Sequence, residues 1–542
     1  MSAFSNRRCP ECGSLSTGLP ESPPSMGETF DPSVEPETRH YALLTSNEPP
    51  EESESTFIQS LISKTDAPLA RLDKEISKLQ EHLKMLEEAR EFLRGYRTWN
   101  KAIFSPLRRI PPEVLREIFS WTLPSIRDAL HSGRFEMGQS PWVLTQVCSR
   151  WRAVSISTPS LWSQVAIDYP QNLRTSSTYS LSLVEAQIQR SQKLKIHFYG
   201  NHKMDSRVQI QMFELLSQHS SHWEELSIGL TSAIAPLLTS LRDRIPSLAR
   251  LWIQWDGWQG QIGIPSIDCF ETAPSLVDVG VLNKHRFLPI LLPAYQLTRY
   301  EVDCPWEEHR RILTQTLGLI EARVYVDFDE EPWPDPNEII GLLQLQRLYV
   351  SDPQILRYLM APALKGLALL GAPEDGSELL SHFHSFLDRS SCRLQRLCFR
   401  GHPTPSTTTE ILQKCPSITE LVLVHDDDNA RESINALIAS LTVSNLPKST
   451  VVAPHLELVY VGCPEESYID YAAFLEMLES RWKAENCALK TAALVIEDGP
   501  GPDPRTCAGL LGLHAEGLNL LLLDGVAAQD EMECWSFSAS WN

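Results

Sequence analysis

Cys9 and Cys12 form the cysteine pair whose spacing fits metal chemistry best in this chain. A Cys-x-x-Cys pair has the spacing of zinc ligands, but a structural zinc ion needs two further ligands. No second pair follows at the distance that a zinc ribbon or knuckle requires, and the nearby histidine is His40. Zinc binding and a solvated pair of thiols are both open, and the pattern favours the thiols, so we predict no metal.

A second group that could hold a cation is His425 with the three aspartates that follow it, residues 426–428. These side chains come directly after an apolar run, which favours an exposed turn at the end of a strand. The chain has none of the motifs HExxH, GxxxxGK[ST], GxGxxG and GxSxG, which are typical of zinc proteases, nucleotide-binding proteins and hydrolases. We therefore predict a protein that is not an enzyme and carries no cofactor.

Composition restricts the classes of partner. The 542 residues carry a formal net charge of -21, which argues against nonspecific binding to nucleic acid or to an anionic membrane. The start of the chain has no apolar signal region, and the longest apolar run, residues 518–523, is too short to span a bilayer. The 12 cysteines are scattered, as expected of reduced thiols. We expect a soluble protein of the cytoplasm or nucleus.

The N-terminal part of the chain divides into two segments. Residues 1–60 are rich in Pro, Ser and Glu, which predicts a disordered acidic tail. Residues 61–100 predict one helix with Pro68 in its first turn and Gly95 at its end. Its apolar residues alternate by three and four: Leu69, Leu72, Ile76, Leu79, Leu83, Leu86 and Leu93. This heptad seam fits a coiled-coil homodimer and equally a helix packed on the next segment.

Residues 101–168 predict a compact helical segment. Pro111 and Pro112 suit a first helical turn, and apolar residues follow on one face of the helix that they begin. A second helix is expected from Leu144 to Val154, before Pro159. Helices this short are marginal alone in water, so their apolar faces must be buried against something.

The order of features in this segment resembles the F-box family: an apolar residue, Pro-Pro-Glu, a helix ending in Ile-Phe, then Val-Cys-x-x-Trp-Arg and Thr-Pro-x-Leu-Trp. One departure is the stretch 125–139, which is longer than the usual link between the two helices. The resemblance implies docking on a Skp-type adaptor of a cullin-RING ubiquitin ligase. The adaptor-binding residues that it implies are Leu107, Ile110, Pro111, Pro112, Val114, Leu115, Ile118, Phe119, Leu144, Val147, Cys148, Trp151, Leu161 and Trp162.

Residues 169–542 repeat an apolar pattern that is the core of a leucine-rich repeat: apolar, two variable residues, apolar, one variable residue, apolar. A proline often stands two places before a match, where it would stop a preceding helix. Each repeat is expected to hold a strand, a turn and a helix, and stacked repeats form a curved solenoid with a parallel sheet. The matches begin at Trp223, Leu248, Leu276, Leu297, Leu319, Leu345, Leu364, Leu394, Ile418, Leu456, Leu489 and Ala515.

The variable positions of these strands predict a concave surface, because alternate side chains point to opposite faces of a strand. Arginines recur there, and we expect those of neighbouring strands to form a basic column that binds a carboxylate-rich or phosphorylated target. The alternative, which the sequence favours, is neutralisation within the sheet by Glu301, Asp303 and Asp327. The predicted target-binding residues are Arg250, Trp252, Arg299, Arg323, Tyr325, Arg347, Tyr349 and Arg396.

The sequence thus predicts a mixed α and α/β fold: an N-terminal helix, a helical F-box and an irregular leucine-rich-repeat solenoid with a parallel sheet. The predicted function is substrate recognition in an SCF-type ubiquitin ligase. Such a receptor contributes effective concentration and has no catalytic residue, because the conjugating enzyme supplies the transfer chemistry. The alternative is an F-box and repeat scaffold that assembles proteins without ubiquitination.

Overall fold

The computed structural model describes residues 34–131, 137–169, 179–283, 285–328, 333–335, 338–370, 376–401, 405–424, 431–443, 451–465, 469–498, 501–525 and 527–528. Cys9, Cys12 and residues 425–428 lie outside this part of the chain. The chain divides into two compact units, Met1–Ile110 and Pro111–Asn542. We call them unit 1 and unit 2 and describe each by itself.

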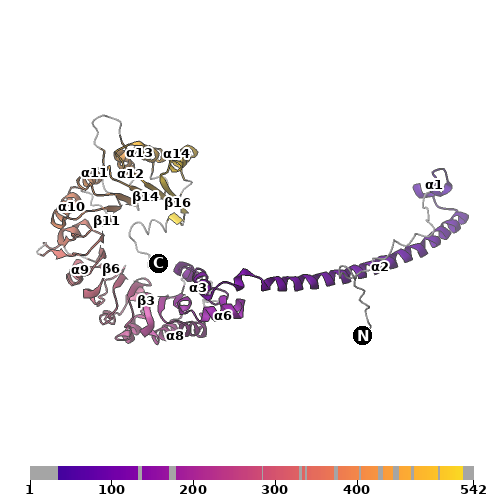
Figure 1. Ribbon diagram of the computed structural model, residues 1–542, viewed down its shortest axis with the longest axis horizontal. Helices are drawn as coiled ribbons and strands as arrows, with labels where there is room; N and C mark the ends of the chain where they lie inside the picture. The colour runs from indigo at the N-terminus through magenta and orange to yellow at the C-terminus, as the bar shows by residue number, and fades with distance from the viewer. Residues whose placement is uncertain are drawn as a thin grey trace. The chain divides into compact units, whose positions relative to one another are not determined.

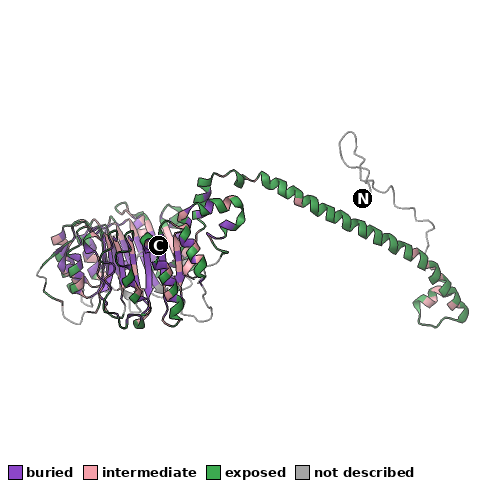
Figure 2. Cartoon of the chain, turned by 90° about the horizontal axis from the view of Figure 1, so that it is seen from below, coloured by how far each residue is buried: buried purple, intermediate pink, exposed green. Residues whose placement is uncertain are grey.

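Unit 1 contains helix α1 (Arg39–Thr45), the long helix α2 (Glu52–Ile103) and the short 3-10 helix η1 (Pro106–Arg108). Figure 2 shows α2 exposed along almost its whole length, and none of its residues is buried. The heptad leucines are about half exposed, from 51% for Leu72 to 63% for Leu79. The seam therefore has no packing partner among the described residues.

The sequence-based bounds of this helix were wrong at both ends, and the expected disorder was wrong for part of residues 34–60. Helix α1 begins after Thr38, whose hydroxyl accepts the Tyr41 N–H. Helix α2 begins with a capping box between Glu51 and Glu54, sixteen residues before Pro68. A proline inside a helix removes one N–H donor, and here the helical turns on either side of Pro68 continue.

Unit 2 begins with short helices, which occupy the segment that resembles an F-box. They are α3 (Pro112–Ser120), α4 (Ile126–His131), α5 (Leu144–Val147), α6 (Ser149–Ile156) and the 3-10 helix η2 (Pro159–Trp162). The long link noted in the sequence contains α4. Residues 132–136 of that link are not described.

The rest of unit 2 is built on one large parallel sheet whose strand order follows the chain, β1 to β7, then β9 and β11 to β16. In Figure 1 the sheet curves, with its strands on the inner side and the helices on the outer side. Strands β1 to β7 span Gln164–Asp168, Leu194–Tyr199, Trp223–Leu230, Arg250–Trp255, Asp278–Leu282, Arg299–Cys304 and Glu321–Val326. Strands β9 and β11 to β16 span Arg347–Val350, Gly366–Leu370, Arg396–Arg400, Glu420–Val424, Leu458–Glu465, Thr491–Asp498 and Asn519–Asp524.

Helices connect the strands near both ends of the sheet, and one helix, α9, connects β6 and β7 in the middle. They are α7 (Leu181–Arg190), α8 (Ser206–Ser217), α9 (Trp306–Leu313), α10 (Gly376–Ser390), α11 (Pro405–Lys414), α12 (Arg431–Leu441), α13 (Tyr471–Lys483) and α14 (Pro504–Ala515). Several middle connections use 3-10 helices instead: η3 (Ser220–His222), η4 (Ala235–Leu241), η5 (Trp258–Gln261), η6 (Ala294–Gln296) and η7 (Pro353–Tyr358). A small separate sheet pairs β8 (Ile340–Gly341) with β10 (Leu359–Met360).

Every apolar match in the sequence coincides with a strand of the large sheet from β3 to β16. The expectation of a helix in each repeat was wrong for the middle strands, where Pro265, Pro274, Pro289 and Pro293 interrupt the connections and cannot donate helical hydrogen bonds. Strands β1 and β2 were not predicted. The fold is therefore a mixture of helices and one large parallel sheet.

The sheet has two distinct faces because side chains alternate along each strand. The outer face carries residues such as Leu226 and Ile253, which are fully buried in the main core with Phe213 and Phe474 of the helices. The inner face carries the variable positions of the repeats. Candidate interaction residues therefore fall on the inner face or on the helices that begin unit 2.

Candidate protein-interaction surfaces

Helix α3 carries two apolar stripes, and the first is buried. Leu115 and Phe119, four residues apart, are 1% and 0% exposed. The Phe119 ring lies 4.8 Å from the Trp151 ring of α6, measured between centroids. This stripe fixes α3 on α6 and forms part of the fold.

The second stripe of α3 is exposed. Val114 is 47% exposed and Ile118 42% exposed, and Trp121, directly after the helix, is 82% exposed. Spacings of four and three place these residues along one side of the helix. The Trp121 indole N–H donates to Glu117 Oε1 at 3.1 Å, which orients the ring. We call Val114, Ile118 and Trp121 the α3 stripe; Trp121 was missed in the sequence analysis although its i+7 spacing from Val114 was visible.

The predicted second helix is broken into α5 and α6, so the expectation of one continuous helix was wrong. Cys148 is extended between them, with φ of -161°, and its Sγ accepts the Trp151 N–H at 3.4 Å. The break separates the apolar residues: Leu144 and Val154 are buried, whereas Val147 and Cys148 are exposed. Two helices of one turn to two turns thus replace the longer helix.

The residues implied by the family resemblance therefore divide into a packed group and an exposed group. The packed residues are Leu115, Phe119, Leu144, Leu161 and Trp162, with Ile110 and Trp151 half-buried. The exposed residues are Leu107, Pro111, Pro112, Val114, Ile118, Val147 and Cys148.

The helical segment is attached to the sheet by a stack of aromatic and cationic groups. The Arg190 guanidinium of α7 lies 4.5 Å from the ring centroids of both Trp142 and Trp162. The Trp142 indole N–H donates to Gln187 Oε1 at 3.1 Å, and the Trp162 indole N–H donates to the Ser155 carbonyl at 2.8 Å. These contacts hold the helices against the first strands.

A row of alternating charge crosses the inner face of the sheet. Strand register places each member opposite the next: Lys195, Glu225, Arg250, Asp278, Arg299, Glu321, Arg347, Gly366, Arg396 and Glu420. Opposite charges on neighbouring strands attract, whereas like charges directly opposite would repel. We call this set the charge row. It is interrupted only at Gly366, which separates Arg347 from Arg396.

This register corrects the predicted basic column. Glu321, and not Arg323, occupies the position between Arg299 and Arg347. Arg323 lies two residues further along β7, opposite Glu301 and Tyr349. The column was wrong because Arg323 follows the second apolar residue of its repeat, whereas the other arginines precede it.

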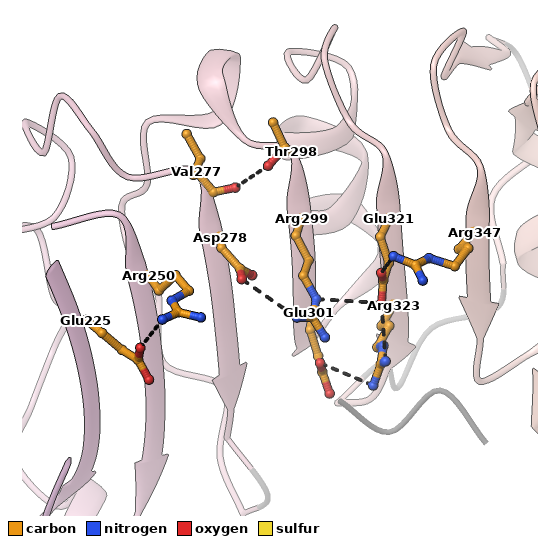
Figure 3. A network of polar contacts seen from close by, with 10 residues as sticks. All are labelled: Glu225, Arg250, Val277, Asp278, Thr298, Arg299, Glu301, Glu321, Arg323 and Arg347. Carbon is orange, nitrogen blue, oxygen red and sulfur yellow. Dashed lines mark hydrogen bonds and ion pairs between the residues drawn. The ribbon is translucent and has the colours of Figure 1, made fainter. Parts of the chain in front are cut away.

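Glu321 is the centre of the ion pairs, as Figure 3 shows. Its carboxylate lies 3.6 Å from Arg299 Nε, 3.2 Å from Arg323 Nη2 and 2.7 Å from Arg347 Nη2. Glu321 is 6% exposed. Glu321 was not predicted from the sequence, although its position directly before the second apolar residue of its repeat could have identified it.

The other arginines of the inner face are paired as well. Arg250 contacts Glu225, Arg299 Nη1 lies 3.7 Å from Asp278 Oδ2, and Arg396 Nη1 lies 3.7 Å from Glu420 Oε2. Arg323 Nη1 lies 3.4 Å from Glu301 Oε2, as the alternative expectation held. The second expected partner, Asp303, instead accepts the Asn283 backbone N–H at 2.5 Å. No ion pair between Asp327 and an arginine is present within the described ranges.

Burial changes the protonation of several groups on this face. Burial raises the pKa of Glu301 to about 7 and of Asp278 to about 6, and neighbouring arginines oppose both shifts. Burial lowers the pKa of His197 to about 4, helped by Lys195 and Arg250. His197 Nε2 lies 3.4 Å from Glu225 Oε1. The network thus pairs opposite charges but contains carboxyl groups that are costly to ionise.

The predicted aromatic residues lie on the same face in different settings. Trp252 lies over Gly280 of the next strand, where a Cβ atom would meet the indole ring at 2.1 Å. The rings of Tyr325 and Tyr349 are 4.9 Å apart between centroids, and Tyr349 is buried. Tyr349 belongs to an apolar cluster of the C-terminal strands. Trp252 and Tyr325 are half-buried and are therefore reachable by a partner.

No family model and no curated protein sequence matches this chain. Across the ranges that the structure describes, no group of three or more His, Cys, Asp or Glu side chains is arranged to hold a metal ion. Within the same ranges, no helix combines the length and the apolar character needed to cross a membrane.

Proposed function

We propose that this protein is a substrate receptor of an SCF-type ubiquitin ligase. In this proposal the helices of residues 111–162 form an F-box that docks a Skp-type adaptor, and the large sheet is a leucine-rich-repeat solenoid that binds the target on its inner face. The observation that carries the proposal is the double apolar surface of α3. One stripe is packed in the fold, and the other is presented to water.

The α3 stripe is suited to a protein partner because three large apolar side chains, Val114, Ile118 and Trp121, project from one short helix. Contiguous exposed apolar groups mark sites of protein association, and aromatic and aliphatic anchors supply most of the binding free energy. The packed residues Leu115 and Phe119 hold the helix in place beneath this surface. The order of sequence motifs, which resembles the F-box family, favours a Skp-type adaptor as the partner.

The inner face is suited to target binding because some of its arginine side chains remain exposed to solvent although they form ion pairs. The Arg347 side chain is 56% exposed although it pairs with Glu321, and the Arg250 side chain is 38% exposed. Trp252 lies beside Arg250 on the same strand. This combination favours a target segment with carboxylates or phosphates near an aromatic or aliphatic residue.

Helix α2 supports a further element of the proposal, a homodimer through the heptad seam. An isolated helix whose apolar stripe stays in water gains no stability from packing, and this stripe is at least half exposed from Leu69 to Leu93. Two copies of the seam would bury it. Light scattering on the full chain should give twice the monomer mass, and Ile76→Lys with Leu83→Lys should return it to the monomer mass; a wild-type monomer at micromolar concentration would contradict the dimer.

Adaptor docking gives the decisive test. We expect Val114→Asp with Ile118→Asp to weaken binding of a purified Skp-type adaptor by more than tenfold, which corresponds to a loss on the order of 2 kcal/mol. Calorimetric titration measures the affinity. Both side chains are exposed, so the fold should be retained, whereas truncating the buried Phe119 would disturb α3 itself.

The matched control is Leu511→Asp, which places the same charge on an exposed leucine of α14 that is 56% exposed. This variant should bind the adaptor as the wild type does. Equal binding by the α3 double variant, folded by circular dichroism, would rule out the F-box. The alternative role as a non-degrading scaffold predicts adaptor binding, but no rise in the amount of a bound partner when cullin activation is blocked in cells.

A further inference from the structure

The last part of helix α2 carries a second apolar stripe, which is separate from the heptad seam. Figure 2 shows this end of the helix exposed, and the members of the stripe are between 55% and 74% exposed. Steps of seven, four, three and four residues place them on one side of the helix. We call this set the α2 stripe: Met85, Phe92, Tyr96, Trp99 and Ile103.

The α2 stripe and the heptad seam lie on opposite sides of the helix. With 3.6 residues per turn, Trp99 is about 160° around the helix axis from Leu83. The seam positions on either side of Leu93 carry Arg90 and Arg97, so the apolar seam ends in this region. A second copy of the chain that covers the seam therefore leaves the α2 stripe in water.

Cations occupy the side of the helix opposite the α2 stripe. Lys101 is nine residues after Phe92, which places the two side chains on opposite sides of the helix. Glu91, which lies 2.8 Å from Arg94, is the one carboxylate in the sequence from residue 90 to residue 103. This segment is thus basic, although the chain has a net charge of -21. The exposed cations on this side are Arg90, Arg94, Arg97 and Lys101.

Gly95 leaves a gap in the α2 stripe. It lies three residues after Phe92 and four residues before Trp99, so it belongs to the same side of the helix. Nothing lies within 4 Å of the position that a Cβ atom would take there. Glycine inside a helix is unfavourable relative to alanine, and no packing among the described residues requires it. The gap between the two exposed rings can receive a side chain of a partner.

These features favour a partner that surrounds the helix. A membrane surface contacts one side of a helix, so the cations opposite the α2 stripe would point away from anionic headgroups, and the net charge of -21 opposes approach. A calcium-loaded protein of the calmodulin type offers a methionine-rich apolar groove to amphipathic helices, which insert anchors spaced as Phe92, Tyr96 and Trp99 are. Such EF-hand proteins also carry many carboxylates.

We propose that residues 85–103 of α2 bind a calcium-loaded protein of the calmodulin type. Phe92 and Trp99 enter its apolar groove, and Arg94 and Lys101 pair with its carboxylates. Calcium thus determines when this end of α2 is occupied. The inference depends neither on adaptor docking nor on the homodimer.

Titration of the full chain into fluorescent calmodulin, followed by anisotropy, tests this site. We expect a dissociation constant on the order of micromolar or tighter with calcium, and at least tenfold weaker binding with EDTA. Phe92→Asp with Trp99→Asp should weaken binding at least tenfold, because aromatic anchors supply most of the binding free energy. Both side chains are more than 70% exposed, so the fold should be retained, as circular dichroism can check.

The matched control places the same two charges on the heptad seam of the same helix. Leu72→Asp with Leu79→Asp, at side chains that are 51% and 63% exposed, should bind calmodulin as the wild type does. A wild-type chain without calcium-dependent binding, or equal binding by the two double variants, would overturn the proposal.

Two further measurements identify the other occupants of the α2 stripe. Cosedimentation with phosphatidylserine vesicles that is lost in the Phe92→Asp, Trp99→Asp variant, without calmodulin binding by the wild type, would assign the stripe to a membrane. A wild-type dimer that becomes a monomer in this variant by light scattering would assign the stripe to a second copy of the chain. Either result would contradict the proposal.

Discussion

The two halves of the inner face belong to one parallel sheet but have opposite chemistry. From β2 to β9 the inner face carries most of the charge row, with Glu321 held between three arginines. The last two members of the row, Arg396 and Glu420, lie on β12 and β13. From β9 to β15 the inner face also carries an apolar cluster that is separate from the main core, and Val422 and Tyr460 of this cluster are fully buried. The outer face is apolar throughout and packs against the connecting segments.

The two halves are stabilised by different interactions, ion pairs in one and apolar contacts in the other. Ion pairs between strands compensate one another, but the desolvation of charged groups offsets much of their attraction, so they specify register more than they add stability. Apolar side chains fit any complementary surface and gain free energy from whatever covers them. We therefore expect the charged half to be sensitive to loss of a single charge and the apolar half to be the stronger binding surface.

The largest effect is expected at Glu321. Replacing it by Gln leaves three arginines facing one another on a buried part of the sheet, and removal of one partner from a buried ion pair typically costs about 3–5 kcal/mol. Glu321→Gln should lower the free energy of unfolding by this amount. Urea denaturation followed by circular dichroism measures it.

The matched control in the charge row is Glu420→Gln. The Glu420 side chain is 40% exposed and lies 3.7 Å from Arg396, so water screens the pair and the expected loss is less than about 1 kcal/mol. Similar losses of unfolding free energy for the two variants would show that the buried ion pairs of Glu321 contribute no more to stability than the exposed pair of Glu420. The charged half would then not be sensitive to the loss of a buried charge.

The strands were predictable from sequence because their pattern is local. Each match requires only three apolar residues, and every such residue from Leu226 to Leu520 lies in or beside a strand. Strands β1 and β2 lack the full pattern and were missed. The bounds of α2 were also missed, since a capping box at Glu51 and Glu54 outweighed the signal of Pro68 as a helix start.

The candidate site was less predictable, because it depends on register between strands that are 20 to 40 residues apart. A slip of two residues within one repeat moved Arg323 into the wrong row and hid Glu321, although both are adjacent to the same apolar Ala322. The split of the implied adaptor-binding residues into packed and exposed groups also needed the tertiary structure. Ile118 and Phe119 are neighbours in sequence, yet one is 42% exposed and the other fully buried.

A smaller effect than the one at Glu321 is expected from pH. Burial raises the pKa of Glu301 from 4.5 to about 7, so the folded chain holds this proton more tightly than the unfolded chain does. Its contribution to stability is complete below pH 4.5 and is lost as pH rises through 7. His197, whose pKa burial lowers to about 4, contributes in the opposite direction, and its contribution is lost as pH falls from 6.5 through 4.

A difference between variants isolates the Glu301 contribution from that of the histidine. Between pH 5 and pH 8 the wild type should lose about 1–3 kcal/mol more unfolding free energy than Glu301→Gln loses. Arg323 keeps Glu321 as its partner in this variant, so the fold should persist. Urea denaturation at several pH values measures the two profiles. Glu307→Gln, at a side chain of α9 that is 68% exposed, should follow the wild-type profile. Parallel profiles for the wild type and Glu301→Gln would mean that the carboxyl group of Glu301 ionises as easily in the sheet as in water, and that the charged half is already open to solvent.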